Sequence, residues 1–250
     1  MSVALETHSL CKSFGALTVA DDIDFRLHTG ARHALIGPNG AGKTTFVNML
    51  MGALAPSSGR IVLGGEDITA AGQAARVKRG LGRTFQINAL FRRLSVLDNV
   101  ALGVAERRGV ARRMLRAASA HGEVRDESME LLATLGLAED AGERILDLPY
   151  GKQRLVEIAI ALGLKPKVLL LDEPAAGVPS VESHRILQVL DKLPEHIAIL
   201  IIEHDMDLVF RFAQRITVLV QGEVLVEGPP EEIARDRRVH QVYLGEQRHG

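Results

Sequence analysis

The sequence predicts an α/β fold with a mostly parallel core sheet, a small antiparallel β subdomain and an inserted α-helical subdomain. Short apolar runs alternate with helical patterns along most of the chain, as expected for a parallel sheet covered on both faces. Residues 17–27 alternate well enough to form a strand of a smaller antiparallel sheet. Residues 87–147 are helical in period and contain no convincing strand.

The expected elements follow one another in a regular order. The run ARHALIG at 31–37 reads as a buried strand, and AGKTTFVNMLMG continues as a helix. Further strands are expected at 60–65, 167–174, 197–204, 215–222 and 223–228. We therefore expect one domain over 1–250, with an α/β core at 1–86 and 148–250 and the helical subdomain at 87–147.

Composition excludes several classes of function. The 250 residues are 46% hydrophobic and 24% charged, with a formal net charge of −1, so nothing predicts long-range attraction to nucleic acid or anionic lipid. The single cysteine, Cys11, cannot form an internal disulfide and fits a reducing compartment. The N-terminal residues do not resemble a signal peptide, and the apolar runs are far shorter than the ~20 residues of a membrane span. We expect a cytoplasmic protein that needs another chain for any work in a membrane.

Residues 37–44, GPNGAGKT, fit the phosphate-binding pattern G-x-x-x-x-G-K-[ST] between a strand and a helix. Backbone N–H groups from Gly40 to Thr44 would cradle the β- and γ-phosphates. Lys43 would add a positive charge, and the Thr44 hydroxyl would bind Mg²⁺. The residues expected to contact the nucleotide here are Gly37, Pro38, Asn39, Gly40, Ala41, Gly42, Lys43, Thr44 and Thr45.

The apolar run VLLLDEP at 168–174 supplies two acidic residues at the end of a buried strand. Asp172 would hold Mg²⁺ through water. Glu173 follows it, where its carboxylate would polarise a water aimed at the γ-phosphate. The chain has no N-K-x-D guanine-recognition motif, so ATP is favoured over GTP.

The stretch LPYGKQR at 148–154 precedes VLLLDE by about twenty residues, with one helix between them. This order resembles the ATP-binding-cassette (ABC) ATPases, whose signature motif lies there. The usual signature is L-S-G-G-Q, and Pro149 stands in place of its serine. The resemblance implies that Gly151 and the Tyr150 amide bind ATP held by the P-loop of a second cassette.

The same resemblance assigns roles to three further residues. Gln86 in RTFQ falls where the family's Q-loop joins the core to the helical subdomain, and would contact Mg²⁺ or the attacking water. His204 in IIEHDM matches the switch histidine, which reaches the γ-phosphate. Phe14 in KSFG stands where an aromatic ring stacks on adenine. The segment AAGVPS, at 175–180, matches the position of the D-loop.

The combination of these motifs with a terminal YLGE resembles LivG-type ATPases of branched-chain (hydrophobic) amino acid importers. That resemblance implies ATP and Mg²⁺ as cofactors, two membrane permease subunits, a companion ATPase subunit and, indirectly, a periplasmic solute-binding protein. The chain would then sit peripherally on the cytoplasmic face of the inner membrane.

Three alternatives stay open at this point. The C-terminal segment also resembles ATPases of lipopolysaccharide export. Relatives of the LivG-type group import urea, amides or organic acids. A soluble ABC protein or a nucleotide-gated binding module would be a different class, but the chain has neither a second cassette nor the basic stripe that nucleic-acid binding favours.

Overall fold

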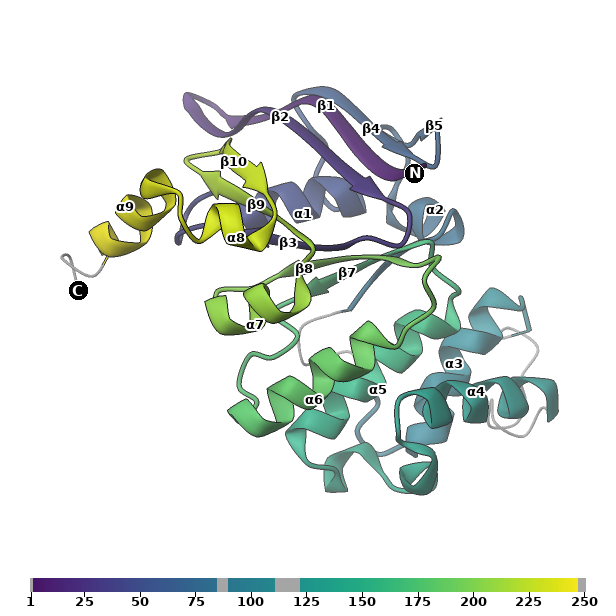
Figure 1. Ribbon diagram of the computed structural model, residues 1–250. Coiled ribbons are helices and arrows are strands. Elements are labelled where there is room, and N and C mark those ends of the chain that lie inside the picture. The colour runs from purple at the N-terminus through teal and green to yellow at the C-terminus, as the bar shows by residue number, and fades with distance from the viewer. Residues whose placement is uncertain (1, 85–89, 111–121, 247–250) are drawn as a thin grey trace. The chain divides into compact units, whose positions relative to one another are not determined.

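The computed structural model describes residues 2–84, 90–110 and 122–246, which form two compact units (Figure 1). The first unit comprises Met1–Leu81, Lys167–Glu173 and Pro194–Gly250. The second comprises Gly82–Pro166 and Pro174–Leu193. Each unit is therefore assembled from segments that are distant in sequence.

Two β-sheets lie in the first unit, except that only Leu81 of strand β6 belongs to that unit. The smaller sheet is antiparallel and has the strand order β2-β1-β4-β5. The larger has the order β10-β9-β3-β8-β7-β6, in which β9, β3, β8 and β7 pair in parallel and β10 runs antiparallel to β9. The strands are β1 (Val3–Phe14), β2 (Leu17–His28), β3 (Arg32–Ile36), β4 (Ser58–Leu63), β5 (Glu66–Asp67), β6 (Leu81–Arg83), β7 (Val168–Asp172), β8 (Ala198–Ile202), β9 (Arg215–Val220) and β10 (Glu223–Gly228).

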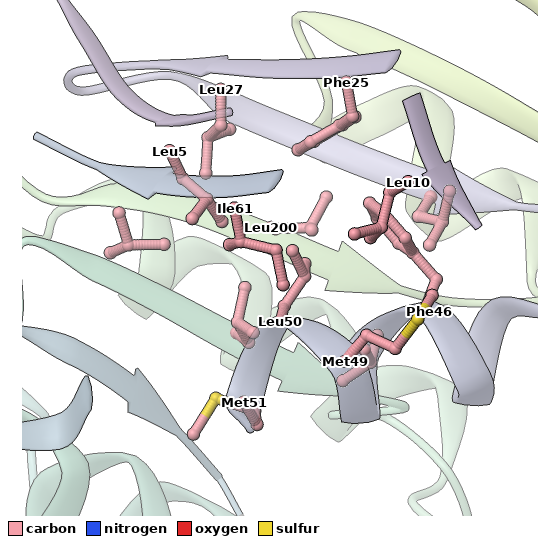
Figure 2. Packing of buried hydrophobic residues seen from close by; sticks show 14 of the residues in the cluster. Leu5, Leu10, Phe25, Leu27, Phe46, Met49, Leu50, Met51, Ile61 and Leu200 are labelled. Carbon is pink, nitrogen blue, oxygen red and sulfur yellow. The ribbon is translucent and has the colours of Figure 1, made fainter. Parts of the chain in front are cut away.

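Helix α1 (Lys43–Met51) contributes to the main hydrophobic core of this unit. Its buried side chains, which include Phe46 and Leu50, cluster with residues of both sheets, such as Leu5 and Leu200 (Figure 2). The Phe46 ring meets the Phe25 ring edge-on, with centroids 5.6 Å apart. Burying each of these side chains stabilises the fold by about 1.5–3 kcal/mol. The core therefore anchors the helix that directly follows the glycine-rich turn.

The remaining helices of the first unit are short. Helix α7 begins with a side-chain cap. The Asp205 carboxylate accepts hydrogen bonds from the backbone N–H groups of Asp207 (3.0 Å) and Leu208 (3.3 Å). These helices are α2 (Gln73–Lys78), α7 (Met206–Phe212), α8 (Pro230–Ile233) and α9 (Arg237–Glu246).

The described helices and 3-10 turns of the second unit are α3 (Val96–Arg107), α4 (Gly122–Thr134), η3 (Ala138–Asp140), η4 (Ile145–Asp147), α5 (Tyr150–Gly163) and α6 (Ser180–Asp191). Ser95 caps α3 by accepting from the Asp98 N–H at 3.0 Å. Helices α3 and α5 approach closely at Gly103, where an added Cβ would lie 2.8 Å from the Ile160 carbonyl oxygen. A side chain at that position would force the two helices apart.

The predicted fold class is confirmed, and the structure shows which of the two sheets one expected strand joins. The strand expected at 60–65 pairs antiparallel with β1, so it belongs to the small sheet and not to the parallel core. An apolar run alone does not say which sheet a strand joins. The assignment of 87–147 as an inserted subdomain stays a prediction. Part of the helical pattern expected there, at 111–121, lies outside the described residues.

Candidate functional site

Three parallel strands bring the predicted catalytic motifs to one edge of the larger sheet. Ile202 of β8 is in register with Leu35 of β3 on one side and with Asp172 of β7 on the other. The carboxyl ends of these strands therefore meet at the same edge. The glycine-rich turn follows β3, Glu173 follows β7 and His204 follows β8. Ligands bind at this edge in open α/β sheets.

The turn at 37–42 depends on two glycines for steric reasons. Gly37 has a φ of +154° and its missing Cβ would collide with the carbonyl oxygen of Leu219 in β9. Gly42 has a φ of +99°, and a Cβ there would lie 2.6 Å from the Val19 carbonyl oxygen. Any larger residue would displace the turn from β2 or β9. Backbone atoms of β2 and β9, which lie outside the motif, thus limit which residues the turn can contain.

Helix α1 begins at Lys43 and has no side-chain cap at its N-terminus. Its first N–H groups and the positive end of its dipole are therefore suited to an anion. The Lys43 ammonium donates hydrogen bonds to the carbonyl oxygens of Gly37 (2.6 Å) and Pro38 (2.9 Å), which fold the side chain back over the turn. Thr44 is exposed and Thr45 is half-buried. This arrangement fits a bound triphosphate, with the Thr44 hydroxyl accessible to a metal ion.

Asp172 and Glu173 differ in backbone conformation. Asp172 ends β7 in regular strand geometry, whereas Glu173 has a φ of +47° in the left-handed region. A residue other than glycine adopts that conformation at a cost of roughly 1–2 kcal/mol. The backbone N–H of Glu173 donates to the Ile202 carbonyl at 2.9 Å, which holds this strained residue against the neighbouring strand. The side chain is 42% exposed, so its carboxylate is accessible to a ligand.

His204 is brought to Glu173 by the pairing of β7 with β8. Its Nδ1 lies 3.7 Å from Glu173 Oε1 and 3.8 Å from Glu203 Oε2. The Glu203 carboxylate is buried and accepts a hydrogen bond from the His204 backbone N–H at 3.2 Å. The sequence reasoning missed Glu203, although an acidic residue inside the apolar run IAILIIEH is a signal that could have identified it.

Phe14 lies at the end of β1 with its side chain exposed. The Lys12 ammonium lies 5.0 Å from the centre of its ring and donates to the Ala55 carbonyl at 2.8 Å. A cation held there attracts the π face of the ring. Phe14 belongs to the same β1–β2 hairpin as Val19, whose carbonyl contacts the glycine-rich turn. An exposed ring in this place suits base stacking.

The predicted signature lies in the second unit, at the start of α5. Pro149 is the N-cap residue, with φ −55° and ψ 150°, and it provides no side-chain hydrogen bond. Gly151 is buried against the Glu182 carboxylate of α6. Lys152 is drawn toward Asp140, whose carboxylate oxygens lie 2.7 and 2.9 Å from its Nζ. The first turn of α5 thus presents backbone N–H groups without a side-chain cap.

Gln86 lies outside the described residues, so its predicted role is not placed. Within the described ranges, no three His, Cys, Asp or Glu side chains gather into a ready-made metal site. The expected Mg²⁺ site is of a different kind, built from the Thr44 hydroxyl, the Asp172 carboxylate, the Gln86 side chain and the phosphates of the nucleotide. Among the helices at 2–84, 90–110 and 122–246, none is long and apolar enough to cross a bilayer.

A comparison with protein families agrees with this site. A family model described as "ABC transporter" matches residues 20–176, which is more than half of the 250-residue chain. A solved ATP-binding cassette, MJ1267 in its ADP conformation, superimposes with a TM-score of 0.88 at 28% identity, covering 98% of this chain and 100% of that one. The chain therefore belongs to the ABC transporter family and is an ATP-hydrolysing cassette.

Two curated relatives and a second family model narrow the comparison. A model described as "Branched-chain amino acid ATP-binding cassette transporter" matches residues 223–249. The high-affinity branched-chain amino acid transport ATP-binding protein LivG of Escherichia coli K12 is 36% identical over 97% of this chain and 98% of its own length. The lipopolysaccharide export ATP-binding protein LptB of Acidithiobacillus ferridurans is 37% identical over 99% of both chains.

Proposed function

We propose that this cassette hydrolyses ATP to energise import of branched-chain or other hydrophobic amino acids. The observation that carries the proposal is the match of residues 223–249 to the branched-chain amino acid cassette model. Full-length similarity to LivG supports it. The tyrosine-containing signature LPYGKQR supports it as well, because it resembles the signature of that group.

The site residues divide the chemistry among them. The Lys43 ammonium and the N-terminus of α1 bind the β- and γ-phosphates of ATP. Glu173 orients the attacking water and accepts its proton, while His204 reaches the γ-phosphate from the end of β8. Thr44 and Asp172, with Gln86 as a further partner, would hold Mg²⁺, and the bound ion would supply positive charge against the charge that develops on the phosphates. Phe14 stacks on the adenine.

The working unit is a pair of cassettes bound to two permease subunits on the cytoplasmic face of the membrane. The start of α5, with the Tyr150 and Gly151 amides, closes over ATP held by the P-loop of the companion cassette. A periplasmic binding protein delivers the solute. We propose no role in binding nucleic acid, because a protein with a net charge of −1 lacks the excess positive charge that attracts a phosphate backbone.

Lipopolysaccharide export is the second candidate, because the relative LptB is as similar over the whole chain as LivG is. Import of urea, amides or organic acids is a variant of the first proposal. The deciding experiment reconstitutes the cassette with its own membrane subunits in proteoliposomes. We expect ATPase activity to rise with a leucine-loaded binding protein. Stimulation by lipopolysaccharide alone would favour the exporter, and stimulation by a urea-loaded or organic-acid-loaded binding protein would reassign the solute.

A further inference from the structure

Tyr150, the first residue of α5, has a ring that lies near one residue of its own helix and one residue of a different segment. The guanidinium carbon of Arg154, also in α5, lies 5.3 Å from the ring centroid. Gly177 has a φ of +72° and lies so close that an added Cβ would be 3.4 Å from Tyr150 Cε1. The ring therefore joins the start of α5 to the segment 174–179.

The cation beneath this ring is itself held in place. Arg154 Nη1 donates to Glu157 Oε2 at 2.9 Å, and each of the two side chains is only 6% exposed. Burial raises the pKa of the Glu157 carboxyl group, although the hydrogen bond from Arg154 opposes that shift. Burying an ion pair costs desolvation free energy, so such a pair is weak evidence for a purely stabilising role. Its evident structural consequence is a guanidinium fixed under the Tyr150 ring.

The start of α5 is held by side-chain contacts and not by a cap: Lys152 binds Asp140, and the Tyr150 ring lies near Arg154. Pro149 supplies no capping side chain, and the serine hydroxyl of the usual signature is missing at this position. The Arg154 guanidinium lies within the range at which a cation is attracted to the face of an aromatic ring, and burial strengthens that attraction. The contact between Tyr150 and Arg154 therefore helps to hold the start of α5 at a place where the helix has no side-chain cap. The backbone N–H groups of the first turn stay available to a ligand.

We infer that Tyr150, Arg154 and Glu157 are positioning residues, which hold the start of α5 against segment 174–179 so that the α5 amides meet the nucleotide of the companion cassette. This inference rests on the proposed function, because only a paired cassette brings a nucleotide to α5. Arg154 and Glu157 are both buried. They act on hydrolysis through Tyr150.

The test is a double-variant cycle in the assembled transporter. One variant is Tyr150→Leu, which removes the ring. The other replaces both charges, Arg154→Met with Glu157→Met, so that no charge is left buried alone. We expect each to lower kcat about tenfold and the combination to be no worse than about tenfold, because all three residues form one unit. Tyr150→Phe keeps the ring and should recover more than half of the parent rate.

Three measurements separate positioning from general damage. ATP binding by each variant chain alone should stay within about twofold of the parent, because the P-loop belongs to the first unit and the three substituted residues to the second. Circular dichroism and the Tm check folding; if the double charge replacement does not fold, the Tyr150→Leu and Tyr150→Phe comparison decides. Replacing the exposed pair Arg79→Ala with Glu66→Ala, whose closest nitrogen and oxygen are 2.7 Å apart, is the matched control and should leave kcat unchanged.

Losses that multiply to about a hundredfold would overturn the inference, because they would show that the ring and the ion pair act independently. An unchanged kcat in Tyr150→Leu would overturn it too, as would equal losses in Tyr150→Phe and Tyr150→Leu. A parent complex without ATPase activity would overturn the proposed function, and this inference with it. An active parent whose losses multiply would overturn this inference alone.

Discussion

Oε1 of Glu173 and Nδ1 of His204 lie 3.7 Å apart, at the ends of neighbouring parallel strands. Neither residue reaches this place through its own side-chain packing, since both are substantially exposed. Strand pairing positions them: Asp172 is in register with Ile202, and the Glu173 N–H donates to the Ile202 carbonyl. The pairing of β7 with β8 therefore brings Glu173 and His204 together. Each residue can be substituted and tested separately.

Lys43→Ala should abolish tight ATP binding. The ammonium is the main side-chain cation for the β- and γ-phosphates, and charge-assisted bonds of this kind are worth about 1.5–3 kcal/mol each. In the structure it is held on the turn by the Gly37 and Pro38 carbonyls, ready to reorient toward phosphate. Equilibrium binding of labelled ATP measures the loss. Lys78→Ala, which removes an exposed lysine from α2, is the control, and equal affinity in both variants would refute the phosphate-cradle assignment.

Arg76→Met should lower the free energy of unfolding by about 3 kcal/mol, because it removes a buried charged hydrogen-bond donor. The guanidinium is fully buried and donates to the carbonyls of Ala71 (2.7 Å), Met49 (2.6 Å), Leu50 (2.6 Å) and Thr69 (2.8 Å). Two of these carbonyls belong to the last turn of α1, where a cation also opposes the negative end of the helix dipole. Methionine would leave buried acceptors without donors.

Urea denaturation of the Arg76→Met variant measures this loss. Arg79→Met is the control, because Arg79 is partly exposed and its pair with Glu66 is worth no more than about 1 kcal/mol. If the two variants lost equal stability, the buried guanidinium would not be what secures the C-terminal end of α1.

Stability should fall as the pH drops from 6.5 toward 4, because of His33. Burial lowers the pKa of this imidazole from 6.5 to about 4, outweighing the opposing charge of Glu227, while Arg215 and His28 lower it further. The unfolded chain therefore binds a proton in this range that the folded chain refuses, so acid favours unfolding. At about 1.36 kcal/mol per pKa unit, the full loss is about 3 kcal/mol.

Thermal unfolding of the parent and of His33→Gln at pH 7 and pH 5 tests this contribution. The variant has no proton to exchange at this position and should show a smaller decrease of Tm between the two values. The exposed His196→Gln serves as the control and should keep the parent's pH dependence. A parent whose Tm does not change with pH would contradict the account.

Gly151→Asp should block hydrolysis in the assembled complex while ATP binding by the chain alone is kept. The added Cβ would meet the Glu182 carboxylate of α6, which must move aside, and the new charge would repel both that carboxylate and a triphosphate. Gly151→Ala crowds Glu182 without adding charge and separates the two effects. Loss of ATP binding together with hydrolysis would indicate misfolding, and normal hydrolysis would mean that LPYGKQR only starts a helix.

The sequence predicted the fold class because local signals were strong at each strand of the larger sheet. The runs VLLL and IAILII fold as the fully buried strands β7 and β8, and the motif residues follow them directly. Sequence spacing did not reveal which strands are neighbours, so the approach of His204 to Glu173 required the structure. The same holds for β4, whose apolar run is compatible with either sheet.

The supporting residues were the part that sequence reasoning missed. Arg76 reads as an ordinary charged residue on a short helix, yet its guanidinium is buried on backbone carbonyls that come from segments distant in sequence. Nothing in the local sequence distinguishes Arg154 and Glu157 from solvated helix charges, although both are buried. In each case burial depends on tertiary neighbours, and a single sequence carries no direct signal for it.

Glu173→Gln is the most direct test of the site's chemistry. The amide keeps the size of the side chain but accepts a proton poorly, so the variant should bind ATP like the parent and lose most hydrolysis. The exposed Glu195→Gln is the control for loss of a carboxylate and should hydrolyse normally. The decisive measurement is the ATPase rate of the reconstituted transporter carrying Glu173→Gln. We predict a fall of at least about a hundredfold, with retained ATP binding and a closed cassette dimer. Hydrolysis at the parent rate would show that Glu173 is not the base and would pass that role to His204.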